Sequence, residues 1–344
     1  MSFEFASRPL RTLHLHAISA PKHHPNLLKM KTVLLEVRSE IGAGTRGASL
    51  GIDALKVAAR NKKDRFFAPF EKVVVPHQNQ ALDKEDQHPR AHRIDSMVQV
   101  YRDVCDNVAS VFSAGNYPLI LTADHASAGG TLAGLRKANP GKRIGVIWID
   151  AHFDLNTPYT SNSGNIHGMP LAVAIQDDNT ECAYHEVPDS TKAFWDEMKD
   201  TSGRGSSVNG EDLVFIGIRD PDAAEKSLVK KYNMPVHLVE HVHEKGATAI
   251  AEMSMNHLKD CDLIYVSLDV DSMDTSISVG TGTPVAGGLM PQEVKDLLRV
   301  FLASSKTQCF EMVEVNPTLD TKNAMANTAF DILKLSAELI ESRK

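Results

Sequence analysis

The stretch RIGVIWIDAHFD (residues 143–154) decides how this chain folds and where its chemistry lies. Its first seven residues are almost continuously apolar, which is typical of a strand buried on both faces of a parallel sheet. Asp150, His152 and Asp154 then occur at every second position, so an extended chain sends all three to one side. Because two carboxylates and an imidazole are costly to desolvate, this strand end needs arginine, lysine or a metal ion as a partner.

Similar apolar runs recur along the chain, and a helical pattern follows most of them, as in βαβ units. Two polar stretches, 77–93 and 177–211, are predicted to be loops, the second an insertion or long surface connection. The sequence therefore predicts an α/β fold with a parallel sheet. The expected strands are 32–37, 117–123, 143–149, 212–218, 235–239, 263–268 and 309–315; the expected helices are 49–61, 93–113, 128–138, 223–232, 246–259, 290–303 and 321–342.

Composition narrows the class of partner. The 344 residues, 42% of them hydrophobic, can bury a large core in one big domain or two smaller ones. A net charge of −7 without a long basic run argues against nucleic acid or an anionic membrane and favours a small molecule. Four dispersed cysteines indicate neither a disulfide framework nor a thiolate zinc site, which fits a reducing cytoplasm.

Residues 1–30 differ in character from the rest of the chain. Residues 1–30 lack the apolar core of a secretory signal, and we expect a loosely ordered N-terminal extension, with a transit peptide as the alternative. No apolar stretch is long enough to span a bilayer. We find no linker that divides residues 31–344, which we expect to form a single domain.

Acidic residues gather where the expected strands end. Because the carboxyl ends of parallel strands converge on one crevice, these dispersed positions should form one acidic pocket. An uncompensated buried anion is expensive, so acids beyond those that a metal needs imply a cationic substrate. The residues concerned are Asp124 and His125; Asp150, His152 and Asp154; Asp220 and Asp222; Asp269 and Asp271; and Glu314.

Three motifs, ADHAS (123–127), DAHFD (150–154) and DVDSMD (269–274), carry the metal hypothesis. Two histidines with at least four aspartates form an oxygen-rich donor set that suits Mn²⁺, and there are enough carboxylates for two ions. Any single aspartate could instead cap a helix, and a single Zn²⁺ ion bound by some of these ligands is the competing site. Three such clusters at strand ends favour metal over capping.

Two further stretches are candidates for substrate binding. NTPYTSNSGNIHG (156–168) leaves the metal-site strand directly, so its hydroxyls and amides can bind polar substrate groups, and His167 can shuttle protons. The alternative for His167 is a solvated loop histidine. In RDPDAAE (219–225), Asp222 and Glu225 could simply cap the following helix.

Taken together, DAHFD, NTPYTSNSGNIHG, LDVDSMD, TGTPVAGGL (281–289) and MVEVNP (312–317) resemble the motifs of the ureohydrolase family over roughly residues 32–340. The loops are most similar to those of arginases. The resemblance implies a three-layer α/β/α sandwich with a mainly parallel eight-stranded sheet and two Mn²⁺ ions per subunit. It also implies hydrolysis of L-arginine to L-ornithine and urea by a cytoplasmic homo-oligomer, either a trimer or a hexamer.

The resemblance also implies a role for each motif residue. One ion would be held by His125, Asp150, Asp154 and Asp269, and the other by His152, Asp150, Asp269 and Asp271, so that Asp150 and Asp269 bridge. The substrate α-carboxylate would bind to Asn156, Ser161 and Ser163, and the α-amino group to Asp222 with Glu225 behind it; Thr283 belongs to the same site. The guanidinium would pair with Glu314, while Asp154 and His167 transfer protons.

The chain departs from the family pattern beside His125. Thr122 and Ala123 stand where two glycines are usual, and Ala126 where a serine is usual. We expect these changes to alter the surroundings of His125 and the affinity for its ion. Two alternatives to arginine hydrolysis remain, namely another guanidino substrate such as agmatine, and a family member that binds a ligand without turnover.

Overall fold

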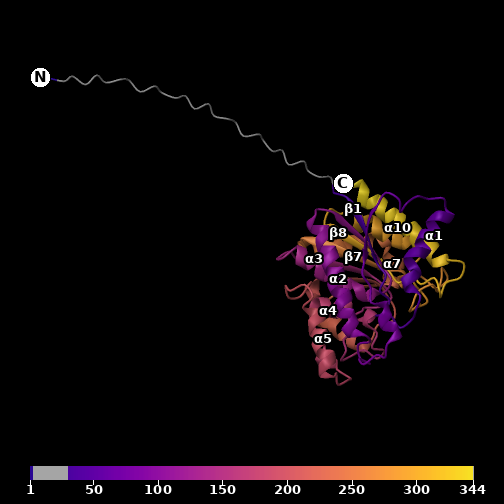
Figure 1. The fold of residues 1–344 in the computed structure, drawn as a ribbon. Helices are drawn as coiled ribbons and strands as arrows, with labels where there is room; N and C mark the ends of the chain where they lie inside the picture. The colour runs from indigo at the N-terminus through magenta and orange to yellow at the C-terminus, as the bar shows by residue number, and fades with distance from the viewer. Residues whose placement is uncertain (3–29, 344) are drawn as a thin grey trace.

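Eight parallel strands form one sheet at the centre of the computed structural model, which describes residues 1–2 and 30–343 (Figure 1). The strand order is β2-β1-β3-β8-β7-β4-β5-β6, and every pair of neighbours is parallel. The strands are β1 (Thr32–Val37), β2 (Glu71–Val75), β3 (Tyr117–Thr122), β4 (Ile144–Ile149), β5 (Leu213–Ile218), β6 (Val236–Leu238), β7 (Leu263–Asp269) and β8 (Thr307–Val313).

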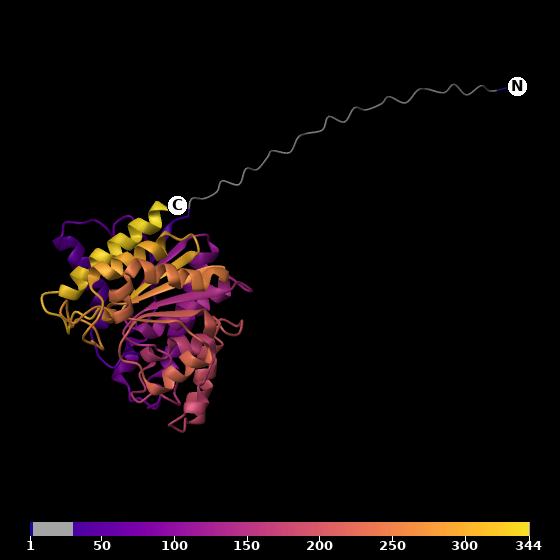
Figure 2. The ribbon, with the colours of Figure 1, turned by 180° about the vertical axis from the view of Figure 1, so that it is seen from behind.

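Helices cover both faces of the sheet, so the domain has three layers (Figures 1 and 2). One face packs against α2 (Ile94–Ser113), α3 (Ala128–Ala138), α4 (Pro170–Ile175), α5 (Asp189–Lys199) and α6 (Ala223–Lys231). The other face packs against α1 (Gly51–Asn61), α7 (Val239–Lys245), α8 (Ala247–His257), α9 (Pro291–Ala303) and α10 (Ala324–Ser342). No helix among the described residues is long and apolar enough to cross a membrane.

The period-two geometry of each strand supplies two hydrophobic cores. In β4, Val146 and Trp148 point into the core below α2 and α3, whereas Ile147 and Ile149 point into the core below α8 and α9. All six residues of this strand are buried. The apolar run that opened the sequence analysis is therefore continuous because both of its faces are covered.

The expected α/β fold with a parallel sheet is confirmed. All seven predicted strands occur within two residues of their expected ends, and all seven predicted helices within three. The eighth strand, β2, was not predicted because its EKVVV sequence is short and largely exposed at the sheet edge. Helices α4 and α7 were also missed, since six and seven residues are too few to show a helical period.

The prediction of a long surface connection over 177–211 is wrong in part. This segment contains α5, whose Trp195 and Met198 are buried against the core beneath α2. The Trp195 indole donates a hydrogen bond of 2.7 Å to Asp178, which fastens the helix to the preceding loop. The predicted N-terminal extension, 1–30, lies almost entirely outside the described residues.

Candidate metal centre and substrate pocket

Four neighbouring strands, β3, β8, β7 and β4, bring the predicted metal ligands and Glu314 together at their carboxyl ends; Glu314 follows β8, and the metal ligands come from the other three. Side-chain alternation orients them, because Trp148 and Asp150 share one face of the chain through β4. In the same way Tyr265, Ser267 and Asp269 share one face of β7, and Trp148 lies directly opposite Ser267 in the strand register. The expected convergence of the acidic strand ends is thus a consequence of strand order.

His125 follows β3 and is held on three sides. Its ring stacks on Trp148 with a centroid separation of 3.9 Å and an interplanar angle of 4°. Its Nε2 lies 2.8 Å from Ser267 Oγ. Its Nδ1 lies 3.0 Å from an Asp150 oxygen and 3.2 Å from oxygens of both Asp154 and Asp269. One nitrogen of this imidazole is therefore anchored, and the other faces three carboxylates.

His152 forms a second cluster that shares Asp150 with the first. Its Nδ1 lies 3.4 Å from Asp150 Oδ1 and 3.1 Å from Asp271 Oδ2. The ligand atoms within each of the groups His125–Asp150–Asp269 and Asp150–His152–Asp271 all lie within 4.8 Å of one another. This arrangement matches a bridging role for Asp150, whereas Asp269 groups with the first cluster only.

The carboxylates in these clusters perturb one another. Burial, together with the charge of Asp150, raises the pKa of Asp154 to about 6. Burial also raises the pKa of Asp269 well above its ordinary value, and the charge of Asp271 adds to this. Burial disfavours charge on Asp150 as well, but hydrogen bonds with His125 and His152 outweigh it and lower that pKa. The site thus holds protons that a bound cation would displace.

The donor set fits a pair of metal ions. His125 Nδ1 and Asp150 Oδ2 are buried and lie 3.0 Å apart, with oxygens of Asp154 and Asp269 only 3.2 Å from the same nitrogen. Carboxylate oxygens and neutral imidazole nitrogens suit divalent first-row metals. Of the described side chains that line the adjoining pocket, none is Lys or Arg, so only histidines offset the charge of these acids in the absence of metal. A binuclear metal site explains the carboxylates better than the helix-capping alternative does.

The pocket at this edge has a volume of about 140 Å³. Four predicted site residues do not line it: Asp150 and Glu314 lie behind the wall, and Ser161 and Ser163 lie in the neighbouring loop. The wall consists of His125, His152, Asp154, Asn156, His167, Gly168, Asp220, Asp222, Glu225, Asp269, Asp271 and Thr283, whose hydroxyl bonds to Asp271 at 3.2 Å.

The N-terminus of α6 places the acidic side chains opposite the metal clusters. The Asn156 amide donates a 3.0 Å hydrogen bond to Asp222. Glu225 accepts from the backbone N–H groups of Leu155 at 3.0 Å and Asp222 at 3.1 Å, so the capping interpretation holds for Glu225. Burial, with the charge of Asp154, raises the pKa of Glu225 to about 8. Asp222 keeps an oxygen at the pocket wall.

The serine-containing loop after β4 is held by the preceding part of the chain. Ser161 Oγ accepts from the Gly164 N–H at 2.9 Å, and the Ser163 carbonyl accepts from His92 Nε2 at 2.9 Å. His92 in turn bonds to Asp86. Gly164 has φ of +74°, and a Cβ there would lie only 2.3 Å from the Pro89 carbonyl oxygen, so glycine is required. The predicted loop 77–93 thus supports the candidate substrate loop.

His167 in the pocket wall pairs with Glu314 behind the wall. His167 Nδ1 lies 3.0 Å from Glu314 Oε1, which also accepts the backbone N–H of His125 at 3.0 Å. Burial disfavours the charged imidazole, but the bond to Glu314 outweighs it and raises the pKa of His167 to about 9. Glu314 Oε2 is buried and has no hydrogen-bond partner among the described atoms. That oxygen therefore keeps an open acceptor position behind the pocket wall.

The departures from the family pattern leave His125 in place. Thr122 donates its hydroxyl to Glu311, and Ala123 and Ala126 are buried. Ala126 packs so closely on the loop after β1 that a Cβ at Gly42 would lie 2.5 Å from its methyl group. His125 still reaches its carboxylate partners. The altered ion affinity remains a prediction.

Three residues important for the site were not predicted. The Arg219 guanidinium donates to the carbonyls of Gly217, Asp271, Ser272 and Val285 at 2.7–3.0 Å, which joins two strand ends to the loop 281–289. An arginine directly after a strand and before two acids was the available signal. Trp148 and Ser267 could have been found by counting back two residues from Asp150 and Asp269.

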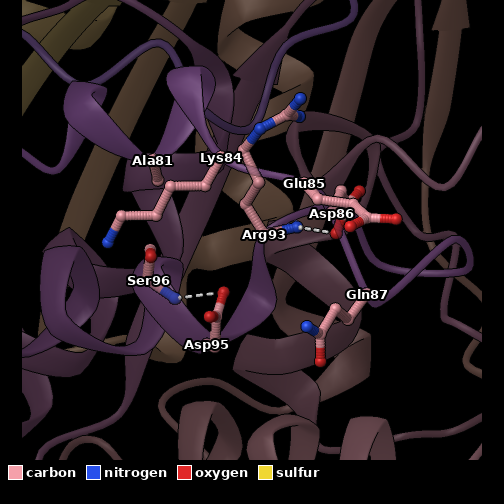
Figure 3. A pocket seen from close by; sticks show the side chains of 8 residues that line it. All are labelled: Ala81, Lys84, Glu85, Asp86, Gln87, Arg93, Asp95 and Ser96. Carbon is pink, nitrogen blue, oxygen red and sulfur yellow. Dashed lines mark hydrogen bonds between the residues drawn. The ribbon is translucent and has the colours of Figure 1, made fainter.

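A second cavity, of about 340 Å³, lies between the end of the loop 77–93 and the start of α2 (Figure 3). Asp86 accepts the Arg93 N–H at 3.1 Å there. Figure 3 shows the charged ends of Lys84 and Arg93 pointing away from each other. The polar groups that line this second cavity do not converge on a common point, in contrast to those of the metal clusters.

The fold and the site define a class of protein, namely an α/β/α domain with a binuclear metal site at the carboxyl edge of its parallel sheet. The chain matches the model of the Arginase family over residues 30–338 and belongs to this family of ureohydrolases.

Individual relatives agree with this assignment. The arginase of Brevibacillus brevis is 34% identical over 309 residues, covering 87% of this chain and 95% of that protein. The arginase of Bacillus subtilis is 31% identical over 297 residues, covering 86% and 93%. The crystal structure of arginase from Bacillus cereus superimposes with a TM-score of 0.75 at 29% identity, covering 89% of this chain and 98% of that one.

Proposed function

We propose that this protein is an arginase, which hydrolyses the guanidinium group of L-arginine to give L-ornithine and urea with two Mn²⁺ ions per subunit. The observation that carries the proposal is an acidic pocket that no described Lys or Arg side chain lines. Such a pocket favours a cationic substrate beside metal ions, since each uncompensated anion is costly. The arginase relatives support the same substrate.

The ends of the substrate bind to different elements in this proposal. The α-amino group binds to Asp222 at the start of α6, and Glu225 fixes Asp222 through its backbone N–H. The α-carboxylate binds to Asn156 and to the loop that carries Ser161 and Ser163. Thr283 completes the same binding site. A structure of the Entamoeba histolytica arginase in complex with L-ornithine, at 25% identity and a TM-score of 0.74, supports an amino-acid ligand for this chain.

The reacting end of the substrate lies deeper. One metal ion would be held by His125, Asp150, Asp154 and Asp269, and the other by His152, Asp150, Asp269 and Asp271. When bound, such ions supply a water nucleophile at neutral pH and polarise the guanidinium carbon.

The protein side chains orient the guanidinium and transfer protons. Glu314 accepts charge-assisted hydrogen bonds from the planar guanidinium through Oε2, which has no other partner among the described atoms. Asp154 takes a proton from the attacking water and passes it to the leaving amine. His167 lines the pocket and exchanges protons between bulk water and the site.

Urea release tests the proposal directly. The full-length protein is treated with chelator, and half of it is reloaded with Mn²⁺; both samples are then assayed with L-arginine and with agmatine, which lacks the α-carboxylate. We expect urea from L-arginine in the loaded sample only, and at least about tenfold less from agmatine, because the loss of one charged contact costs more than 1.4 kcal/mol. A folded, Mn²⁺-loaded protein that releases no urea from L-arginine contradicts the proposal. A higher rate of urea release from agmatine than from L-arginine identifies agmatine as the substrate instead.

We also propose a cytoplasmic homo-oligomer, either a trimer or a hexamer, on the family resemblance and on the cysteine usage. Light scattering on the eluting protein tests the oligomer, and a monomer at micromolar concentration contradicts it. We further propose that residues 31–344 form one catalytic domain.

A further inference from the structure

A carboxylate with no cationic partner lies inside the sheet. Glu311 is fully buried in the middle of β8. Its Oε2 accepts the Tyr265 hydroxyl at 2.7 Å, and its Oε1 accepts the Thr122 hydroxyl. None of the described Lys, Arg or His side chains pairs with it. Since an acid is almost never fully buried without such a partner, its position calls for a reason beyond packing.

The neighbours of Glu311 lead to the first metal cluster. Ser267 lies directly opposite Glu311 in the register of β7 and β8, and Tyr265 lies on the same face of β7. The Ser267 hydroxyl interacts with the Tyr265 phenol. Ser267 Oγ also lies 2.8 Å from His125 Nε2. Three buried side chains thus connect the carboxylate to the imidazole.

The hydrogen bonds between Glu311 and His125 all run in one direction, starting from the Glu311 carboxyl group. The Tyr265 hydroxyl donates to Glu311 Oε2. The Tyr265 oxygen is then left as an acceptor, and Ser267 donates to it. Ser267 Oγ in turn accepts, and the donor it meets is the Nε2–H of His125. This order leaves the Nδ1 lone pair of His125 for the side that faces Asp150, Asp154 and Asp269.

We propose that Glu311, Tyr265 and Ser267 form a hydrogen-bond relay that fixes His125 in its metal-binding tautomer. All three act as positioning residues, because none of them faces the pocket. Thr122, at one of the positions where the chain departs from the family pattern, belongs to the same network, since it satisfies the second oxygen of Glu311. The inference rests on the metal site of the proposed function, and it concerns the affinity for one ion and not the identity of the substrate.

Stepwise Mn²⁺ titration of the chelator-treated, full-length protein tests the relay. We expect Tyr265→Phe to weaken one of the two binding steps by about 10- to 100-fold and to leave the other within about twofold, as for other residues that orient a metal-bound histidine. Ser267→Ala breaks the relay next to His125 and should weaken the same step. Tyr117→Phe is the matched control, because Tyr117 is an equally buried tyrosine on β3 that does not line the pocket, and both steps should stay unchanged.

The outcomes separate the relay from the proposed function. The relay is overturned if folded Tyr265→Phe and Ser267→Ala both bind Mn²⁺ with wild-type affinity at each of the two binding steps. It is also overturned if these variants lose affinity equally at both steps, or if Tyr117→Phe loses as much affinity as they do. If Tyr265→Phe fails to fold, Ser267→Ala decides, since it removes only one hydroxyl. A wild-type protein that binds two Mn²⁺ ions but releases no urea from L-arginine contradicts the proposed function while the relay stands. A wild-type protein that binds no Mn²⁺ overturns both.

Discussion

Asp150 is the residue on which the whole site depends. It directly follows β4 and contributes oxygens to both His/Asp clusters. Its two neighbours at period two, His152 and Asp154, divide between the clusters. Asp154 adopts a left-handed conformation, with φ of 52°, which is a strained backbone of the kind that is typical of functional sites.

Metal binding should release protons. The pKa of His125 and that of His152 are both raised above the ordinary value, because the carboxylate partners outweigh the effect of burial. At neutral pH the metal-free imidazoles are therefore charged, and since metal binds only neutral imidazole, metal affinity should rise with pH. Calorimetry of Mn²⁺ binding in buffers of different ionisation enthalpy should show about two or more protons released per subunit. Binding without proton release contradicts this charge state.

His167→Ala should separate proton transfer from metal binding. Its side chain bonds to Glu314 and belongs to neither His/Asp cluster, so we expect kcat to fall by about 100-fold while both ions are retained. Asp271→Ala is the contrasting variant, because Asp271 belongs to the second cluster and its loss should reduce Mn²⁺ occupancy. Metal analysis and urea assays on both variants provide the measurement. Loss of metal from His167→Ala would contradict the assigned role.

At the scale of elements, each strand ends in a loop whose position depends on other loops. The His92–Asp86 pair holds the Ser163 carbonyl, and Arg219 joins the ends of β5 and β7 to the loop 281–289. A parallel strand can deliver a side chain to the edge of the sheet, but hydrogen bonds between loops decide the shape of the pocket. These bonds join segments that are far apart in the sequence.

Arg219→Met should destabilise the protein without removing a metal ligand. Four carbonyls would lose their donor, and leaving such groups unsatisfied costs about 3 kcal/mol in total, which lowers Tm by roughly 5 °C. Thermal unfolding of the metal-free protein measures this change. Arg299→Met is a suitable control, because Arg299 is exposed and its one ion pair among the described residues is with Asp296 in its own helix. Equal Tm values for the two variants would show that the carbonyl bonds contribute little.

At the scale of the molecule, the described residues 30–343 contain the eight-stranded sheet and both hydrophobic cores. The four strands that carry the site are adjacent at the centre of the sheet, and the two edge strands, β2 and β6, carry none of the metal ligands. Helices on both faces hold the central strands, so the ligands start from the most rigid part of the fold.

A chain that begins at Met30 should keep this fold. The first strand starts at Thr32, and both cores are formed by residues after that point. We therefore expect the Tm and the Mn²⁺ stoichiometry of the shortened chain to equal those of the full chain within error. A clear fall in either quantity would contradict the proposal that residues 31–344 form one complete domain.

Sequence reasoning predicted most of the fold and most of the residues in the pocket wall. Seven strands and seven helices were found because covered strands are continuously apolar and long helices show their period. Strand β2 and helices α4, α5 and α7 were missed because short or half-exposed segments lack these signals. Ser161 and Ser163 were named by motif, but their distance from the pocket wall depends on how the loop packs.

The sequence by itself determined which residue types follow the strands and that Asp150, His152 and Asp154 come directly after β4. The expected extended geometry over 150–154 is wrong, because the chain bends after Ile149 and Asp154 has φ of 52°. Only the tertiary structure decided which strands are neighbours, and hence that Ser267 anchors His125, that Glu311 lies behind it, and that Arg219 binds four carbonyls. The physical reason is that local patterns fix the direction of a side chain relative to its own strand, whereas a binding site depends on distances between strands that only packing sets.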